Sequence, residues 1–452
     1  MTKNMTEGSP AKLIFLFTLP LLAGNIMQQL FAFVDTLVVG RFLGVDALAA
    51  VGSAGPLMFL MLGFIIGFAS GLSIYTGQRF GARDERGVRQ SAAACIVLSA
   101  AASILFTLLG SCILYPFLVL MQTPPEIIEG AYSFIILIYG GVSAFVFIQL
   151  GANIVRALGD SKGPMIIQAV GLGLNCIFEP IAIGLFHWGI SGAALATIAA
   201  QICGNILFFF YIRRYVPQLH VTRADFCVPF SVYKKHLAVA LPMGFQGSII
   251  AIGAIILQVV LNGLGPEAVA SYAASQRIES IAMMPMMSFG IAIAAYTAQN
   301  YGAKNPRRII EGVRKCAYMS IAFSFFAGAL LITFGGDIMR LFVGAGHEDV
   351  ISYGKMYLTV NGVTYWILSL LFIFRYTLQG LGQSVVPTIA GVMELLMRAG
   401  AAIFLCGWLG FLGACLANPM AWIGSCIPLA IAYFWTRRQL VKARGIEELR
   451  AG

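Results

Sequence analysis

The sequence predicts an all-α integral membrane protein, with twelve transmembrane helices in two six-helix lobes related by a pseudo-two-fold axis along the membrane normal. Of its 452 residues, 59% are hydrophobic and only 11% are charged, whereas a soluble domain carries about a quarter charged residues. The apolar runs last about 20 residues or more, the length that spans a bilayer as a helix, and they lack the alternation of a membrane β-barrel strand. Motifs of the first half also recur in the second.

Twelve apolar segments follow one another along the chain. We expect them at residues 12–39, 47–78, 89–121, 127–155, 163–186, 189–212, 235–262, 267–299, 309–342, 349–378, 386–407 and 410–436. Several exceed the minimum spanning length, which indicates tilted or extended helices. No small-residue cleavage site follows the first segment, so we expect it to be a retained helix and not a signal peptide.

Basic residues gather on alternate connections. Of the 29 Lys and Arg, 23 lie at the two termini or on the even-numbered connections, and only Arg41, Arg340 and Lys355 lie on the opposite side. This is the positive-inside pattern, and it predicts a multi-pass protein of the cell (inner) membrane with both termini in the cytoplasm. The placement of these charges indicates contact with the lipid bilayer. Despite the net charge of +10, we therefore expect no nucleic acid partner.

The two halves of the chain repeat each other. Residues 44–49 (GVDALA) and 78–83 (QRFGAR) recur 221 positions later as GPEAVA and QNYGAK. Each half holds six segments, so both halves insert in the same orientation, as in transporters with parallel repeats. We expect an N-terminal lobe at 1–212, a cytoplasmic linker at 213–235, a C-terminal lobe at 236–440 and a cytoplasmic tail at 441–452.

Four motifs together resemble one transporter family. They are residues 35–40 (DTLVVG), the Gln-x-x-Gly-Ala endings of segments two and eight, residues 156–160 (RALGD) and residues 192–197 (GAALAT). This ordered set is similar to multidrug and toxic compound extrusion (MATE) transporters, and closer to their DinF/MepA-like bacterial branch. The NorM-like branch carries a carboxylate deep in its seventh helix, whereas residues 235–262 contain no Asp or Glu.

The resemblance implies an antiporter, coupled to H⁺ or Na⁺, that exports small amphipathic and often cationic organic compounds by alternating access. We expect a monomer that is not an enzyme and that needs no cofactor beyond the coupling ion. The alternative is a flippase for lipid-linked precursors with a similar two-lobe architecture. Such a flippase should line its cavity with several cationic residues, and we expect only Arg277 and Arg398 to lie deep.

Acidic residues inside apolar segments are the chemical clue, because a charge at bilayer depth costs at least ~2.5 kcal/mol. Asp35 has no basic neighbour within its segment, which indicates a carboxylate that binds the coupling cation or proton. The resemblance adds Glu179, with Asn175 four residues before it and Thr197 eighteen after. The family commonly has Asp at the position of Glu179, and the longer side chain favours H⁺ over a tightly coordinated Na⁺.

Other polar residues in the segments have structural or cavity interpretations. Glu394 and Arg398 stand four apart, which predicts an ion pair on one helix face. Pro20 lies inside the first segment, where a proline kinks a helix, and the resemblance to MATE transporters implies that it is a hinge. Gln276, Arg277, Glu279 and Met287 are the candidates for a substrate cavity in the second lobe. The cysteines form no CxxC pair and no His stands at ligand spacing from one, so we expect no metal site.

Overall fold

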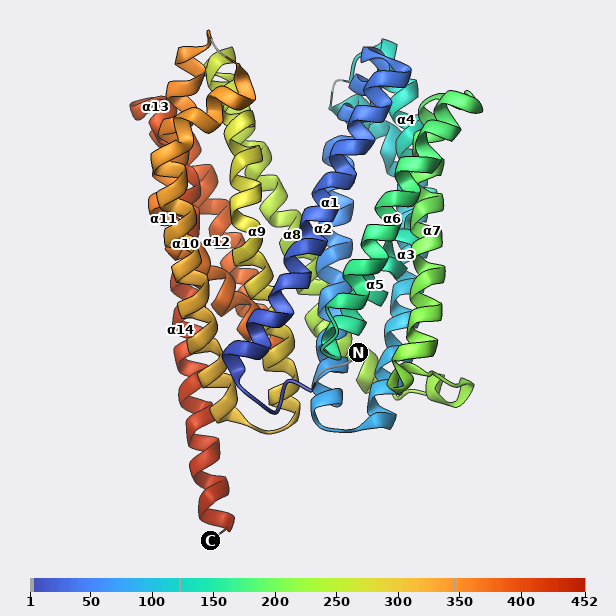
Figure 1. Ribbon diagram of the computed structural model, residues 1–452, viewed down its shortest axis with the longest axis vertical. Coiled ribbons are helices and arrows are strands. Elements are labelled where there is room, and N and C mark those ends of the chain that lie inside the picture. Colours follow the sequence, from blue (N-terminus) through green and yellow to red (C-terminus); the bar gives the residue numbers. More distant parts are fainter. Residues whose placement is uncertain (1–3, 122, 345, 452) are drawn as a thin grey trace. The chain divides into compact units, whose positions relative to one another are not determined.

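The computed structural model describes residues 4–121, 123–344 and 346–451, and most of them lie in long helices (Figure 1). The longer helices are α1 (Pro10–Leu43), α2 (Val45–Gly81), α3 (Glu85–Leu120), α4 (Pro125–Gly140), α5 (Val142–Ala157), α6 (Lys162–Pro180), α7 (Gly189–Tyr215), α8 (Phe230–Asn262), α9 (Pro266–Gly302), α10 (Pro306–Val343), α11 (Glu348–Gly380), α12 (Val385–Gly400) and α14 (Phe411–Ala451). The short elements are the π-turns η1 (Ile181–Leu185) and η4 (Ala401–Leu405), the 3-10 turns η2 (Pro217–Leu219) and η3 (Arg223–Phe226), and α13 (Cys406–Leu409).

The helices account for the twelve predicted segments. Eleven described spans are long and apolar enough to cross a membrane, and the bent pair α4 and α5 supplies a twelfth when it is counted as one span. This pair replaces the continuous segment expected at 127–155. It bends by 49° at the adjacent glycines Gly140 and Gly141, which lack a Cβ and leave the backbone freer to depart from helical geometry. The predicted all-α membrane fold is confirmed.

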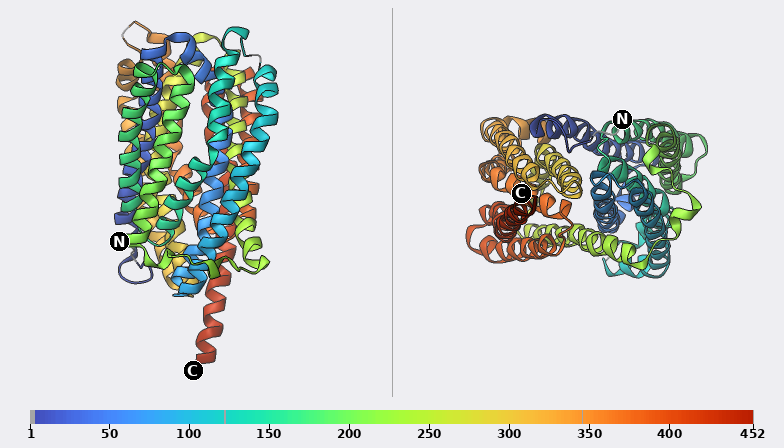
Figure 2. Two further views of the ribbon diagram at one scale, coloured as in Figure 1. Left: turned by 90° about the vertical axis from the view of Figure 1, so that its right-hand side faces the viewer. Right: turned by 90° about the horizontal axis from the view of Figure 1, so that it is seen from below.

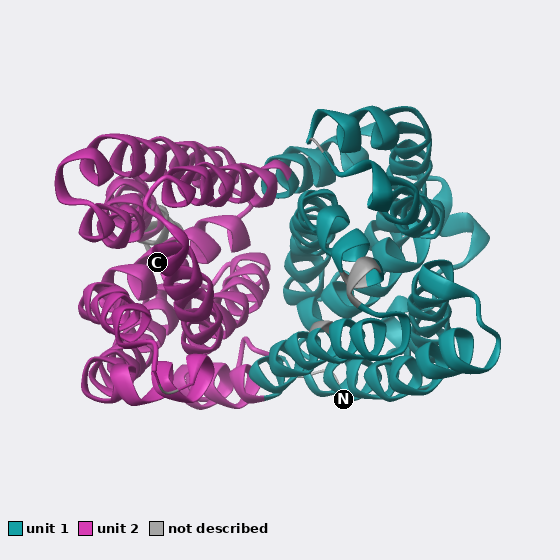
Figure 3. Cartoon of the chain, turned by 90° about the horizontal axis from the view of Figure 1, so that it is seen from above, with its two compact units in different colours: residues 1–4, 20–244 teal, residues 5–19, 245–452 magenta. Residues whose placement is uncertain are grey.

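The chain divides into two compact units (Figure 3). Unit 1 comprises residues 1–4 and 20–244, and unit 2 comprises residues 5–19 and 245–452. The segment expected to be a linker, 213–235, lies within unit 1 and contains η2 and η3. Within each unit the long helices run side by side (Figure 2). The helices α1 and α8 each contribute residues to both units, so the units differ from lobes cut at a single point in the sequence.

The start of the chain is anchored in unit 2. The backbone N–H of Met5 donates to Gln299 Oε1 at 2.9 Å, and Asn300 Nδ2 donates to the Met5 carbonyl at 3.2 Å. Arg308 Nη1 donates to the carbonyl of Gly8 at 2.9 Å. The Gln-Asn pair that makes these contacts belongs to the QNYGAK repeat, so one copy of the repeated motif has an anchoring role.

The first half of α8 is anchored in unit 1 by a buried histidine and by close backbone packing. His236 is fully buried, with Nδ1 2.9 Å from the Leu72 carbonyl and Nε2 3.0 Å from Ser91 Oγ. The carbonyl can only accept, so the ring donates from Nδ1. On α2, Gly67 and Gly71 face the backbone of α8, where any Cβ would approach α8 atoms to 2.5 Å or less. These two glycines therefore bring α2 and α8 close together.

Candidate functional site

A chain of polar side chains in unit 1 joins three helices. Thr197 on α7 donates from its hydroxyl to Asp35 Oδ1 on α1 at 3.4 Å. Asn175 on α6 donates from Nδ2 to the same Thr197 hydroxyl, also at 3.4 Å. Asp35 and Thr197 are 162 positions apart in the sequence, and the packing of α6 on α7 brings Asn175 to the same threonine. Three of the four residues predicted to handle the coupling ion thus form one hydrogen-bonded set.

Glu179 completes this set at the end of α6. Its side chain is fully buried, and neither carboxyl oxygen has a hydrogen-bond partner among the described residues. It interacts electrostatically with Asp35. The next residue is Pro180, which lacks an N–H group, and the helix continues as the π-turn η1. Wide turns of this type are frequent at functional sites. The carboxyl lies where the helix is irregular.

Asn175 adds a further unpaired acceptor. Its Oδ1 is buried without a partner among the described residues, as are both Glu179 oxygens. Buried acceptors normally find a donor, so the two Glu179 oxygens and Asn175 Oδ1, all unpaired among the described residues, indicate a place for a bound proton or small cation. Within the described chain, no three His, Cys, Asp or Glu side chains form a group that could hold a multivalent metal ion.

Asp35 and Thr197 also line a cavity of about 230 Å³ inside unit 1. The rest of its wall consists of apolar side chains, one glycine and four amides: Met27, Gln28, Phe31, Met58, Leu62, Phe134, Ile138, Phe145, Ile148, Gln149, Gln168, Gly171, Leu172, Ala200 and Gln201. This described wall contains no Lys or Arg. Gln168 Oε1 is buried without a partner among the described residues, so it can accept a hydrogen bond from a ligand. The cavity combines one carboxylate, neutral acceptors, and aromatic and sulfur-containing surfaces.

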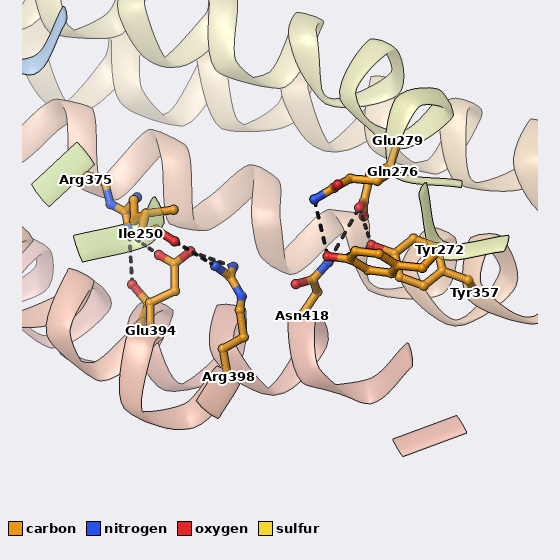
Figure 4. Close-up of polar contacts among 10 residues, drawn as sticks. Ile250, Tyr272, Gln276, Glu279, Tyr357, Arg375, Glu394, Arg398 and Asn418 are labelled. Atoms are coloured by element: carbon orange, nitrogen blue, oxygen red, sulfur yellow. Dashed lines mark hydrogen bonds and ion pairs between the residues drawn. The ribbon is translucent and has the colours of Figure 1, made fainter. Parts of the chain in front are cut away.

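The residues predicted for a cavity in the second lobe lie on α9 in unit 2. Gln276 and Arg277 are exposed, and Met287 is half-buried. Glu279 is buried, and its Oε2 accepts from the Tyr357 hydroxyl at 2.5 Å and from Asn418 Nδ2 at 3.5 Å (Figure 4). None of the four lines a cavity described here.

Glu394 and Arg398 form the expected i, i+4 ion pair, with Arg398 Nη2 3.1 Å from Glu394 Oε1. A third residue joins them, since Arg375 on α11 donates from Nη2 to Glu394 Oε2 at 2.7 Å (Figure 4). Arg375 Nη2 also donates to Ser425 Oγ on α14 at 3.0 Å. All three charged side chains are more than nine-tenths buried.

Sequence reasoning missed the cavity amides and Arg375. The glutamines at positions 28, 149, 168 and 201 interrupt apolar segments, which was a usable signal, because a polar amide inside a membrane helix needs a partner or a water-filled space. Arg375 was also visible as a charge near a segment end. Its partner lies on another helix, so no local spacing pointed to the ion pair.

Comparisons with known proteins agree with this architecture. The MatE family model matches residues 20–181 and again residues 242–403, which also confirms the internal duplication. The chain is 26% identical over 448 residues to "Probable multidrug resistance protein YpnP" of Bacillus subtilis (strain 168), covering 97% of this chain and 98% of that protein. It is 20% identical over 390 residues to "Multidrug export protein MepA" of Staphylococcus aureus (strain MSSA476), covering 86% of each.

A solved structure described as the outward-facing conformation of a multidrug resistance MATE family transporter of the MOP superfamily shares the fold. Its TM-score is 0.89 at 22% identity, covering 98% of this chain and 99% of the other. The two family matches together span well over half of the sequence. The chain belongs to the MatE family of transporters.

Proposed function

We propose that this protein is a multidrug efflux antiporter that exports small amphipathic organic cations in exchange for protons, with Asp35 as the shared binding group. The observation that carries the proposal is the position of Asp35, which lies in the wall of the unit 1 cavity and in the polar set of Thr197 and Asn175. The names of relatives such as YpnP and MepA support drug export.

The cavity chemistry suits an organic cation. The carboxylate of Asp35 supplies the one charge among the described lining residues, and aromatic and methionine side chains offer polarizable contacts for a flat or variable ligand. Gln168 and the other amides accept or donate hydrogen bonds without adding charge. The flippase alternative needs cationic groups for phosphates, and the described lining of this cavity offers none.

Competition for Asp35 provides the coupling. An ionised Asp35 pairs with the ligand cation in a poorly solvated wall, where the attraction is strong. Protonation of Asp35 removes that attraction, so the cation leaves and the proton takes its place. Exchange then follows when the cavity faces the two sides of the membrane in turn, with H⁺ entering as the organic cation leaves.

Glu179 serves as the second proton group. Two carboxyls that interact in a buried site cannot both stay ionised easily, because like charge and lost hydration both penalise the second negative charge. A proton that leaves Asp35 can therefore be held on Glu179, whose oxygens have no other partner among the described residues. Asn175 and Thr197 orient the site through neutral hydrogen bonds.

Pro20 is the proposed hinge of this cycle. It lies inside α1, at the point where the chain passes from unit 2 to unit 1. Because proline cannot donate to the carbonyl four residues earlier, α1 bends more easily there than elsewhere. Asp35 stands fifteen residues further along the same helix, so a bend at Pro20 moves the Asp35 end of α1 relative to its start.

The test is transport of a cationic fluorescent dye by proteoliposomes with an imposed pH or Na⁺ gradient. Asp35→Asn keeps the side-chain shape and removes the titratable group, so gradient-driven export should be lost. Asp337→Asn is the matched control, because Asp337 is exposed on α10 and is not among the residues that line the cavity, and it should transport normally. Normal export by Asp35→Asn at equal protein levels would disprove its role.

Two changes at Glu179 separate proton from sodium coupling. Glu179→Gln should fail, Glu179→Asp should retain partial activity, and a pH gradient alone should drive export. Export driven by a Na⁺ gradient alone, with no response to pH, would overturn proton coupling. Full activity of Glu179→Gln with either ion would make Glu179 a structural residue.

A further inference from the structure

The interior of unit 2 contains an unbalanced group of charges, which we call the arginine triad: Arg375, Glu394 and Arg398 (Figure 4). Each guanidinium binds a different oxygen of the same carboxylate, at 2.7 Å and 3.1 Å. Two positive charges therefore share one negative charge. Glu394 carries one negative charge, so it neutralises only one of the two arginines, and both of its oxygens already accept hydrogen bonds.

The triad lies at a depth where a surplus charge is costly. Arg398 stands near the middle of the 25-residue span Val385–Leu409, and its side chain is 8% exposed. The side chains of Arg375 and Glu394 are each 6% exposed. Charged groups inside membrane spans are normally paired or functional. A net charge of +1 in this position points to a missing anion.

Unused hydrogen-bond donors point the same way. Arg375 Nε and Arg398 Nε are both buried and have no partner among the described residues. Arg398 Nη1 reaches only the Ile250 carbonyl, at 3.5 Å. A guanidinium has five N–H groups arranged to hold planar oxyanions, and buried donors are rarely left without a partner. Both arginines therefore keep donors available to a further acceptor.

Among the described residues, no second acid hydrogen-bonds to these donors. Glu279 is the other buried acid drawn beside the triad in Figure 4, and it interacts electrostatically with Arg398. Its Oε2 is engaged by Tyr357 and Asn418, and its Oε1 has no hydrogen-bond partner among the described residues. No ion pair joins Glu279 to either arginine in the described part of the chain. Gly253 on α8 packs beside Arg398, and a Cβ added there would lie 3.4 Å from Nη1, in ordinary contact.

We propose that Arg375 and Arg398 bind the carboxylate group of a small organic solute beside Glu394. One carboxylate brings the triad from +1 to zero, whereas a phosphate monoester, which carries more than one negative charge, would leave it negative. The planar carboxylate also matches the fork of a guanidinium. This site is separate from the Asp35 cavity, and it gives unit 2 an affinity for anionic or zwitterionic compounds that unit 1 lacks.

The experiment measures thermal unfolding of the purified full chain by tryptophan fluorescence, with benzoate as the probe. Benzamide has the same ring and no charge, so it controls for partitioning into detergent. A ligand that binds the folded state raises the melting temperature in proportion to its occupancy. Benzoate should therefore stabilise the wild type with a saturating concentration dependence, and benzamide should not. Equal shifts from both compounds would overturn the proposal.

Arg398→Gln removes one guanidinium while Glu394 stays paired with Arg375, so this variant should fold. Its dissociation constant for benzoate should rise at least about tenfold, the typical effect of losing a charge-assisted bond. Arg340→Gln removes an exposed arginine on α10 and should bind benzoate like the wild type. Unchanged binding by Arg398→Gln would contradict the proposal.

Glu394→Gln should strengthen benzoate binding, whereas Arg398→Gln should weaken it. This second test does not depend on whether Arg398→Gln folds. Glu394→Gln raises the triad to +2, so benzoate should bind several-fold more tightly and phenyl phosphate should begin to bind. If the triad were only a structural ion pair, Glu394→Gln would lower the melting temperature equally with benzoate and with benzamide. That outcome would refute anion binding.

Discussion

The close approach of α2 and the first half of α8 can be tested by adding one methyl group. Gly67→Ala would place a Cβ 2.2 Å from the Met243 carbonyl oxygen and 2.7 Å from its carbon. Ordinary contact begins at 3.4 Å, so the two backbones must separate by roughly 1 Å. The obstacle is main chain, which cannot rotate away as a side chain could.

The expected loss is the cost of overpacking, about 1–3 kcal/mol. Alanine also stabilises a helix by about 1 kcal/mol relative to glycine, which partly hides the loss. Gly173→Ala is the matched control, because Gly173 lies inside α6 with nothing within 4 Å of its added Cβ. The difference between the two variants therefore isolates the packing contribution.

The assay is thermal unfolding of both variants in the same detergent. An unfolding entropy of about 2.1 cal/mol/K per residue makes 1 kcal/mol equivalent to about 1 °C for a chain of this size. Gly67→Ala should melt about 1–3 °C below Gly173→Ala. If it melts at the same temperature or higher, α8 does not pack against α2 at the distance described.

Three further predictions concern other parts of the chain. Tyr357→Phe removes the hydroxyl that donates to Glu279 and should lower the free energy of unfolding by about 1–3 kcal/mol, whereas Tyr353→Phe, whose hydroxyl has no described partner, should have little effect in the same melts. The Thr222 N–H and hydroxyl, together with Arg89, hold the pKa of Asp225 below its ordinary value. Ionised Asp225 therefore stabilises the fold above about pH 4, and this stabilisation is lost as the pH falls below that value. The melting temperature of Asp225→Ala should lie below that of the wild type at pH 7, and the difference should shrink at pH 3. For topology, single cysteines introduced as Arg86→Cys and Arg308→Cys in a cysteine-free background should be labelled from the cytoplasm, and Thr123→Cys should be labelled from outside. Labelling of position 123 from the cytoplasm alone would contradict the predicted orientation.

The helices were predictable because the signal is local. A run of apolar residues long enough to span a bilayer has few alternatives to a helix, and the repeated GVDALA and QRFGAR motifs revealed the duplication without any contact information. The bend at Gly140 and Gly141 was missed, since hydropathy does not change there. The exchange of residues 5–19 and 230–244 between units was also missed, because it depends on distant partners such as Gln299 and Leu72.

The candidate coupling site was predictable for a different reason. Asn175, Glu179 and Thr197 follow a family spacing, and Asp35 is a solitary acid in an apolar segment, so their identities could be read one by one. Their hydrogen bonds required the structure. The partners of Glu279 come from α11 and α14, and those tertiary contacts leave no trace in local sequence.

The duplication also explains why the two units can carry different chemistry. Both ends of the two family matches are offset by 222 residues. At that offset Asp35 corresponds to Leu257 and Glu179 to Ala401, so the second copy has lost, or never had, the acids of the first. Conversely, Glu394 corresponds to Leu172 and Arg398 to Cys176.

Each charged group thus occurs in one copy on a shared backbone plan. The packing of a helical lobe depends on the apolar pattern and on the small residues between helices. A buried charge is tolerated wherever a partner, proton or ligand neutralises it, so charges can change without a change of fold. The proposed proton-linked cation site in unit 1 therefore places no demand on the charges inside unit 2. The two proposed sites, a carboxylate for organic cations and an arginine pair for an organic carboxylate, are compatible with one duplicated fold for this reason.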